Sequence, residues 1–202
     1  MGSLALVLGL LIFSFILTSV AIIPFINVLY ALRFQRSAQE KTKDMFGKLT
    51  PIFNRFHQKK AGVPIGGGLL VIMVVAMLFA TILPLLKILG IDVTSVYQDV
   101  QAEVNIIFFT FLSFGMLGLY DDIKKFFGFE KNGFFGLKLK HKFLLQLVLG
   151  LIVAIMLYFN LGISILYIPF IGTFQLGWFY IPFATFVIVA FANAVNITDG
   201  LD

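Results

Sequence analysis

The sequence contains no cysteine among its 202 residues, which excludes disulfide bonds and thiolate metal sites. Charge is also scarce, since Asp, Glu, Lys and Arg make up 12% of the chain, against 60% for hydrophobic residues. A mean hydropathy of +1.02 lies outside the range of soluble globular proteins. These shortages favour a polytopic membrane protein.

Two common sequence signals are missing as well. The glycines at 66–68 are not followed by Gly-Lys-Ser/Thr, so they do not form a phosphate-binding P-loop. The first apolar run, residues 4–32, lacks the basic start of a signal peptide and is followed, not preceded, by basic residues. It therefore predicts an uncleaved first span with the N-terminus outside.

Apolar runs organise the whole chain. A bilayer core about 30 Å thick needs roughly 20 helical residues, and five runs are that long or nearly so. They cover residues 4–32, 66–89, 104–120, 143–161 and 177–197. The predicted fold is all-α, with about five transmembrane helices in a single integral membrane domain over residues 1–202. The intervening segment 162–176, rich in β-branched and aromatic residues, predicts a small outer β-hairpin.

Basic residues are concentrated between these runs. Of the 15 Lys and Arg residues, eight lie in 33–60 and six in 124–142, whereas segment 92–103 carries three acidic residues and no basic one. The positive-inside rule then places 33–65, 121–142 and the C-terminal end on the cytoplasmic side. Because the basic residues flank apolar runs, they do not form a face for nucleic acid.

The first polar group on this inner face is Asp121 and Asp122, followed by Lys124 and Lys125. Neighbouring helical residues point about 100° apart, so the two carboxylates cannot aim at one atom unaided. A divalent cation or a phosphate held between them explains the pair. The alternative is an ordinary solvated helix end.

The second group is Asn193, Asn196, Asp199 and Asp202, which recur every three residues. In an α-helix they drift by about 60° per step, whereas in a 3₁₀ stretch they eclipse on one face. Polar residues at membrane depth are candidates for function. The alternative is a polar helix end that faces the cytoplasm.

The third group is "HQKKAGVP" at 57–64, where Lys59 and Lys60 precede a Gly and a Pro that favour a rigid turn. Lysine suits phosphate oxygens, although basic residues beside a span also serve as topology signals. Residues 45–56 predict an interfacial amphipathic segment. Together the three groups indicate Mg²⁺-dependent phosphoryl transfer between a soluble nucleotide and a membrane lipid.

"NAVNITDGLD" at 193–202, the aspartate pair and "HQKKAGVPIGGG" at 57–68 closely resemble the polyprenyl-phosphate sugar-1-phosphate transferase superfamily, best of all its phospho-N-acetylmuramoyl-pentapeptide transferase branch. "YIPF" and "GLKLKHKFLLQ" are also similar to this branch. The resemblance covers essentially the whole chain but only the N-terminal half of the family. It therefore predicts an N-terminal fragment that is inactive alone.

The resemblance implies transfer of phospho-N-acetylmuramoyl-pentapeptide from its UDP carrier to undecaprenyl phosphate, which forms lipid I of peptidoglycan and releases UMP. It implies Mg²⁺ as cofactor and a location in the bacterial cytoplasmic membrane among its lipids. A second copy of the chain, in a homodimer, is a further expected partner. By matching motif, the catalytic candidates are Asp121, Asp122 and Asp199, and the first two lie near the metal. The substrate-binding candidates are Lys60, Lys125, Asn193, Asn196 and Asp202.

One motif departs from the family pattern. Where the family has Gly-Thr-Pro-Thr-Met-Gly-Gly, residues 62–68 read Gly-Val-Pro-Ile-Gly-Gly-Gly, so two hydroxyl groups are lost. Three alternatives stay open. The first is a relative that transfers N-acetylglucosamine-1-phosphate to a polyprenyl phosphate, the second an ion-binding transporter, and the third a non-catalytic membrane subunit.

Overall fold

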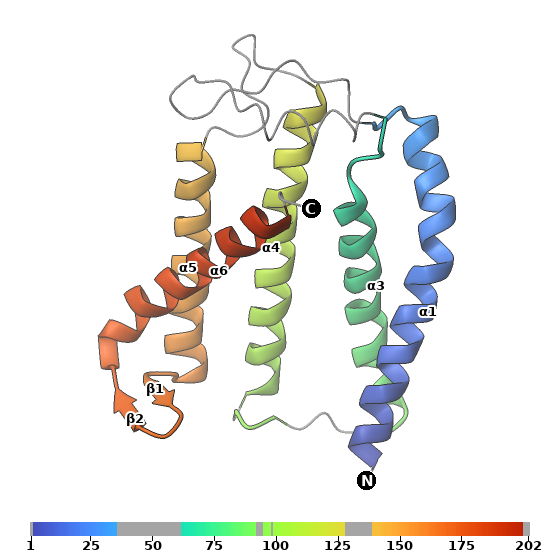
Figure 1. Ribbon diagram of the computed structural model, residues 1–202. Helices are drawn as coiled ribbons and strands as arrows, with labels where there is room; N and C mark the ends of the chain where they lie inside the picture. Colours follow the sequence, from blue (N-terminus) through green and yellow to red (C-terminus); the bar gives the residue numbers. More distant parts are fainter. Residues whose placement is uncertain (1, 36–61, 92–94, 98, 128–138, 200–202) are drawn as a thin grey trace. The chain divides into compact units, whose positions relative to one another are not determined.

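The computed structural model describes residues 2–35, 62–91, 95–97, 99–127 and 139–199 (Figure 1). These residues contain five long helices: α1 (Gly2–Ala31), α3 (Gly67–Ile88), α4 (Val100–Phe127), α5 (Leu139–Leu161) and α6 (Tyr180–Asp199). Each helix includes a stretch long and apolar enough to cross a membrane. The predicted all-α fold with five spans is confirmed.

Helix α4 is longer than the apolar run at 104–120 that predicted it. It has 28 residues and starts at Val100, because the carboxylate of Asp99 accepts a hydrogen bond from the backbone N–H of Ala102 at 3.0 Å and caps the helix. At its other end it continues past Asp121 to Phe127. Hydropathy marks only the part of a helix that lies in hydrocarbon, so the polar turns at both ends were missed.

The predicted hairpin is also confirmed, and its place on the outer side stays a prediction. Strand β1 (Ile165–Ile168) pairs antiparallel with β2 (Gly172–Gln175), in the register Ile165 to Gln175, between α5 and α6 (Figure 1). A short 3₁₀ turn, η1 (Gly177–Phe179), leads from β2 into α6. The ring of Trp178 in this turn lies 5.3 Å from that of Tyr158 on α5. Aromatic clusters of this kind mark the boundary between hydrocarbon and water.

Contacts divide the chain into two compact units. The first comprises residues 1–83 and 115–138, and the second residues 84–114 and 139–202. The first unit therefore contains α1, most of α3 and the end of α4. The second contains the start of α4, α5, the hairpin and α6.

In the first unit, the segments that leave α1 and enter α3 pair with each other. The backbone N–H of Ile65 donates to the carbonyl of Phe34 at 3.0 Å, and Gln35 forms an antiparallel bridge with Pro64. The next residue, Gly66, has a φ of +96°, a backbone conformation that glycine adopts without strain. The start of α3 is thus tied to the end of α1.

The end of α4 approaches α3 closely within the same unit. A Cβ atom on Gly115 would lie 3.1 Å from two side-chain atoms of Ile72, so a larger residue there would meet the α3 side chain. Leu117, two residues later, is also buried. Glycine at this point allows the two helices to pack tightly, as small residues do in membranes.

In the second unit, α5 and α6 pack along each other. A Cβ on Gly150 would lie 3.2 Å from a side-chain methyl of Val189 and 3.5 Å from the backbone carbonyl of Thr185. Ala154 and Ala184 are buried near this contact. The small side chains bring the helix backbones together, and so bring polar side chains of α5 within reach of α6.

Candidate functional site

The aspartate pair lies near the end of α4, in the first unit. Asp121 is only 4% exposed, whereas Asp122 is half-buried. Asp121 follows the buried Leu117 by four residues and so continues the same helix face. The unequal burial agrees with the 100° between neighbouring helical positions.

The burial of Asp121 argues against one reading of the sequence. A solvated helix end would leave its carboxylates in water, but this carboxyl group is almost completely covered. Burying a charge is costly unless it has partners, so such residues are retained mainly where they serve a structural or chemical role. The Asp121 carboxylate is therefore a candidate for function.

The lysines that follow differ in what the structure describes. Lys124 places its ammonium 5.4 Å from the ring centroid of Tyr120, one turn earlier on α4, in a cation–π contact. The backbone of Lys125 belongs to α4, but its side chain lies outside the described part. Lys124 is thus held against its own helix beside the aspartate pair.

The two carboxylates fit one mode of magnesium binding. Within the described residues, no group of three or more His, Asp and Glu residues is placed to hold a metal ion. Mg²⁺, however, usually keeps several waters and takes one or two carboxylates together with substrate phosphates. Asp121 and Asp122 would supply the one or two carboxylates of such a site, in which waters and substrate phosphates provide the other ligands. They do not form a site in which every ligand comes from the protein.

A second polar group joins α5 and α6. The Nδ2 atom of Asn193 donates to Oε1 of Gln146 and to the backbone carbonyl of Val189, both at 2.8 Å. Gln146 is 4% exposed. This amide pair links residues 47 positions apart and crosses the closely packed helix interface.

A second side-chain hydrogen bond joins α5 and α6 one turn away. The ammonium of Lys142 donates to Oδ1 of Asn196 at 3.2 Å. Helix α6 is α-helical as far as Asp199, so the 3₁₀ alternative for this segment is wrong between Asn193 and Asp199. The drift of about 60° over three α-helical residues still leaves both asparagines within reach of α5.

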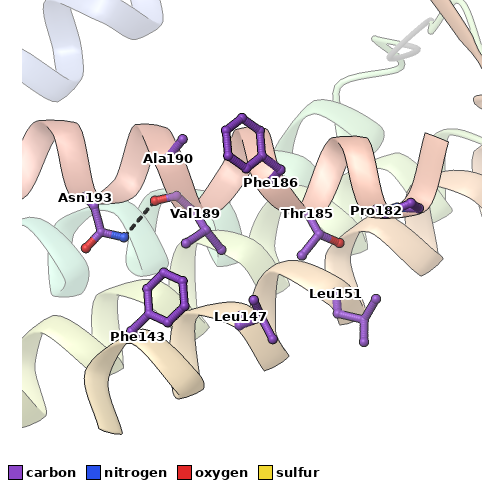
Figure 2. Close-up of a pocket in the computed structure, with 9 residues that line it drawn as sticks. All are labelled: Phe143, Leu147, Leu151, Pro182, Thr185, Phe186, Val189, Ala190 and Asn193. Carbon is purple, nitrogen blue, oxygen red and sulfur yellow. Dashed lines mark hydrogen bonds between the residues drawn. The ribbon is translucent and has the colours of Figure 1, made fainter. Parts of the chain in front are cut away.

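A groove of about 470 Å³ runs between α5 and α6. Figure 2 shows side chains from both helices along it, with Asn193 at one end and Leu151 and Pro182 at the other. Apart from Asn193 and Thr185, its lining is apolar. The groove therefore suits a hydrocarbon chain better than a polar ligand.

Several predicted residues are not described. Lys60, Asp202 and the segment 45–56 lie outside the described residues. The backbone of Asp199 belongs to α6, but its side chain is outside the described part. Their predicted roles stay predictions.

Gln146 and Lys142 were missed as functional candidates, although both lie in the "GLKLKHKFLLQ" string. The available signal was the glutamine itself, a single polar residue within the apolar stretch "FLLQLVLG". A polar residue inside a span is a functional candidate by default.

Comparison with known proteins gives the family. The profile of glycosyl transferase family 4 matches residues 104–202. Two similar relatives are both phospho-N-acetylmuramoyl-pentapeptide-transferases. That of Desulfovibrio desulfuricans is 44% identical over 149 residues, which is 72% of this chain and 37% of the relative. That of Listeria innocua is 34% identical over 190 residues, which is 94% of this chain and 51% of the relative.

The chain thus spans between about a third and half of the length of these relatives. The resemblance inferred from the motifs is confirmed, because the similarity extends over most of the chain and not only over those motifs. With its five apolar helices and bacterial relatives, the chain is a multi-pass membrane protein whose residues 104–202 match glycosyl transferase family 4.

Proposed function

We propose that this chain provides part of the active site of a phospho-N-acetylmuramoyl-pentapeptide transferase. The enzyme would transfer the sugar phosphate from its UDP carrier to undecaprenyl phosphate in the bacterial cytoplasmic membrane, forming lipid I and releasing UMP. The observation that carries the proposal is the buried carboxylate of Asp121 beside Asp122 on a membrane-spanning helix. Relatives that bear this name support the choice of substrates.

The order of the spans supports a reaction at one side of the membrane. If the chain crosses the membrane at each of the five apolar helices, the end of α1, the end of α4 and the end of α6 all fall on one side. The basic residues near the first two ends favour the cytoplasm for that side, where UDP-linked sugars occur.

The reaction needs one bond to form and one to break. An oxygen of the lipid phosphate attacks the phosphorus that carries the sugar, and the bond from that phosphorus to UMP breaks. Asp121 and Asp122 would hold Mg²⁺, which neutralises phosphate charge. One aspartate of the pair would accept the proton of the lipid phosphate, and Asp199 is a third catalytic candidate.

The remaining candidates bind the substrates in this proposal. Lys60 and Lys125 would neutralise diphosphate oxygens, which suits a compact ammonium. Asn193, Asn196 and Asp202 would line the pocket of the nucleotide sugar. The apolar groove between α5 and α6 supports a lipid acceptor, because its lining matches a hydrocarbon chain.

The proposal is tested with the gene product that contains this chain, reconstituted in vesicles with undecaprenyl phosphate. We expect UDP-N-acetylmuramoyl-pentapeptide to yield a lipid-linked product and UMP. EDTA should abolish the reaction and added Mg²⁺ should restore it, since phosphoryl transfer relies on the metal for charge neutralisation. Turnover that is indifferent to EDTA would contradict the role of the aspartate pair.

The choice of donor separates the proposed enzyme from its nearest rival. Transfer from UDP-N-acetylglucosamine, with none from the pentapeptide donor, would identify an N-acetylglucosamine-1-phosphate transferase instead. We expect the 202 residues alone to be inactive, because the relatives are about twice as long. Product formation by the purified 202-residue chain would contradict that expectation.

Lys60→Ala should raise the KM for the UDP-linked donor. Loss of a charge-assisted hydrogen bond costs about 1.5–3 kcal/mol, which corresponds to a decrease of roughly 10- to 100-fold in kcat/KM. Lys59→Ala is the matched control, since it removes the same charge one residue earlier and is not the lysine that matches the active-site position of the family. If both variants keep the KM of the parent protein, Lys60 does not bind the donor.

A further inference from the structure

We propose that Gln146 is a positioning residue, which holds Asn193 so that only its Oδ1 atom remains for a ligand. Asn193 would then recognise an N–H or O–H donor of the soluble substrate and not a phosphate oxygen. This inference deepens the proposed function and rests on it for the identity of the substrate. The hydrogen-bonding argument itself rests on α5 and α6 alone.

The orientation of the Asn193 amide follows from its backbone partner. The carbonyl of Val189 only accepts hydrogen bonds, so the amide atom 2.8 Å from it must be the nitrogen, Nδ2. This nitrogen has two hydrogens, and the second goes to Oε1 of Gln146, also at 2.8 Å. Both donors of Asn193 are therefore used within the protein.

The remaining atom of the amide is an acceptor. Within the part of the chain that the structure describes, no group donates a hydrogen bond to Oδ1 of Asn193. Asn193 is half-buried and lies at one end of the groove, so this atom is accessible to a ligand (Figure 2). Two acceptors repel each other, so a phosphate oxygen is disfavoured at this position.

The position of Gln146 is itself fixed by packing. Its side chain is 4% exposed, and it precedes Gly150 by one helical turn. Gly150 lies close to α6, where it faces Val189, the same residue whose carbonyl accepts from Asn193. The helix contact, the backbone carbonyl and the buried glutamine together leave the Asn193 amide in one orientation.

The contact of Lys142 with Asn196 supports this assignment of roles. An ammonium only donates, so it must face Oδ1 of Asn196, which leaves the Nδ2 of Asn196 to donate. Asn193 and Asn196 therefore present opposite groups, an acceptor and a donor, although they are the same residue type. The difference follows from their partners, which are Gln146 and the Val189 carbonyl for Asn193 and Lys142 for Asn196.

The structural part is tested on the 202-residue chain in lipid nanodiscs, labelled with ¹⁵N-asparagine. Asn193→Ala identifies the side-chain amide signal of residue 193, which should exchange slowly with solvent because both hydrogens are bonded. Gln146→Met should shift this signal and speed its exchange. Gln146→Glu should preserve it, since a carboxyl oxygen still accepts from Nδ2.

Gln175→Met is the matched control, because it makes the same chemical change in the outer hairpin, where Gln175 donates to Ser164. It should leave the Asn193 signal unchanged. If Gln146→Met also leaves that signal in place, Gln146 does not position Asn193 and the inference is wrong.

The functional part uses transferase kinetics of the complete gene product. Gln146→Met should raise the KM for the UDP-linked donor about tenfold with a smaller change in kcat, as expected for loss of one hydrogen bond of about 1.4 kcal/mol. In an Asn193→Ala background it should have no further effect, because it acts only through Asn193. If Gln146→Met raises the KM by the same factor in the Asn193→Ala background as in the parent protein, the inference is wrong. If the parent protein itself is inactive with this donor, the proposed function is contradicted instead.

Discussion

Asp121→Asn is expected to lower the rate of sugar-phosphate transfer by a factor of about 10² to 10³, the range seen when one electrostatic contact to a transition state is removed. Asparagine has almost the same shape as aspartate, so it fits the same buried position on α4. It cannot carry the negative charge that would attract Mg²⁺ in the proposed site or accept a proton at neutral pH. Asp122→Asn should act in the same direction.

The measurement is kcat in vesicles, together with the yield of protein in the membrane. The yield is compared with that of the parent protein, because a lower rate at equal yield separates loss of chemistry from loss of folded protein. The control is Asp99→Asn, at the opposite end of the same helix, where asparagine caps as well as aspartate does. Full activity in both Asp121→Asn and Asp122→Asn would remove the aspartate pair from the reaction.

Most of the fold could be predicted from the sequence, because a membrane imposes strong rules. Each apolar run must form a helix to satisfy its backbone, so the five spans follow from hydropathy. The hairpin after α5 also followed from its short, β-branched and aromatic sequence. The ends of α4 did not follow, because the cap at Asp99 and the turns beyond Asp121 lie outside the hydrocarbon.

The candidate site was predicted only in part. Asp121 and Asn193 were found because polar residues are conspicuous in an apolar chain. Whether Asp121 is solvated or buried depends on what packs against that face of α4, and the sequence does not show this. Gln146 was missed for a similar reason, since its partner lies 47 positions away on another helix.

The packing of Gly150 against α6 is likewise not visible in the sequence. Its substitution is expected to have a large effect on stability. Gly150→Leu should disrupt the pairing of α5 with α6. A Cβ atom alone would already be tight against Val189 at 3.2 Å and in van der Waals contact with the backbone carbonyl of Thr185 at 3.5 Å, so the further atoms of leucine have no room. Overpacking of this kind typically costs about 1–3 kcal/mol, and a backbone atom cannot rotate away. The amide pair of Gln146 and Asn193, one turn from the contact, should separate.

Trp178 provides the measurement, since it is the only tryptophan and its ring lies 5.3 Å from Tyr158 of α5. Its fluorescence should report a lower Tm for Gly150→Leu in detergent. Gly9→Leu is the control, because no atom lies within 4 Å of a Cβ at that position on α1, and it should leave the Tm unchanged.

A compensating pair then separates steric conflict from a general effect of losing glycine. Gly150→Ala places one methyl group against the Val189 side chain, and Val189→Ala removes the atoms that it meets. If packing is the cause, the double variant should be more stable than the sum of the two single changes predicts, whereas Gly150→Leu should not be rescued because it also meets the Thr185 backbone. A strictly additive double variant would show that α5 and α6 are not held together at this contact, and the fixed orientation of Asn193 would lose its structural basis.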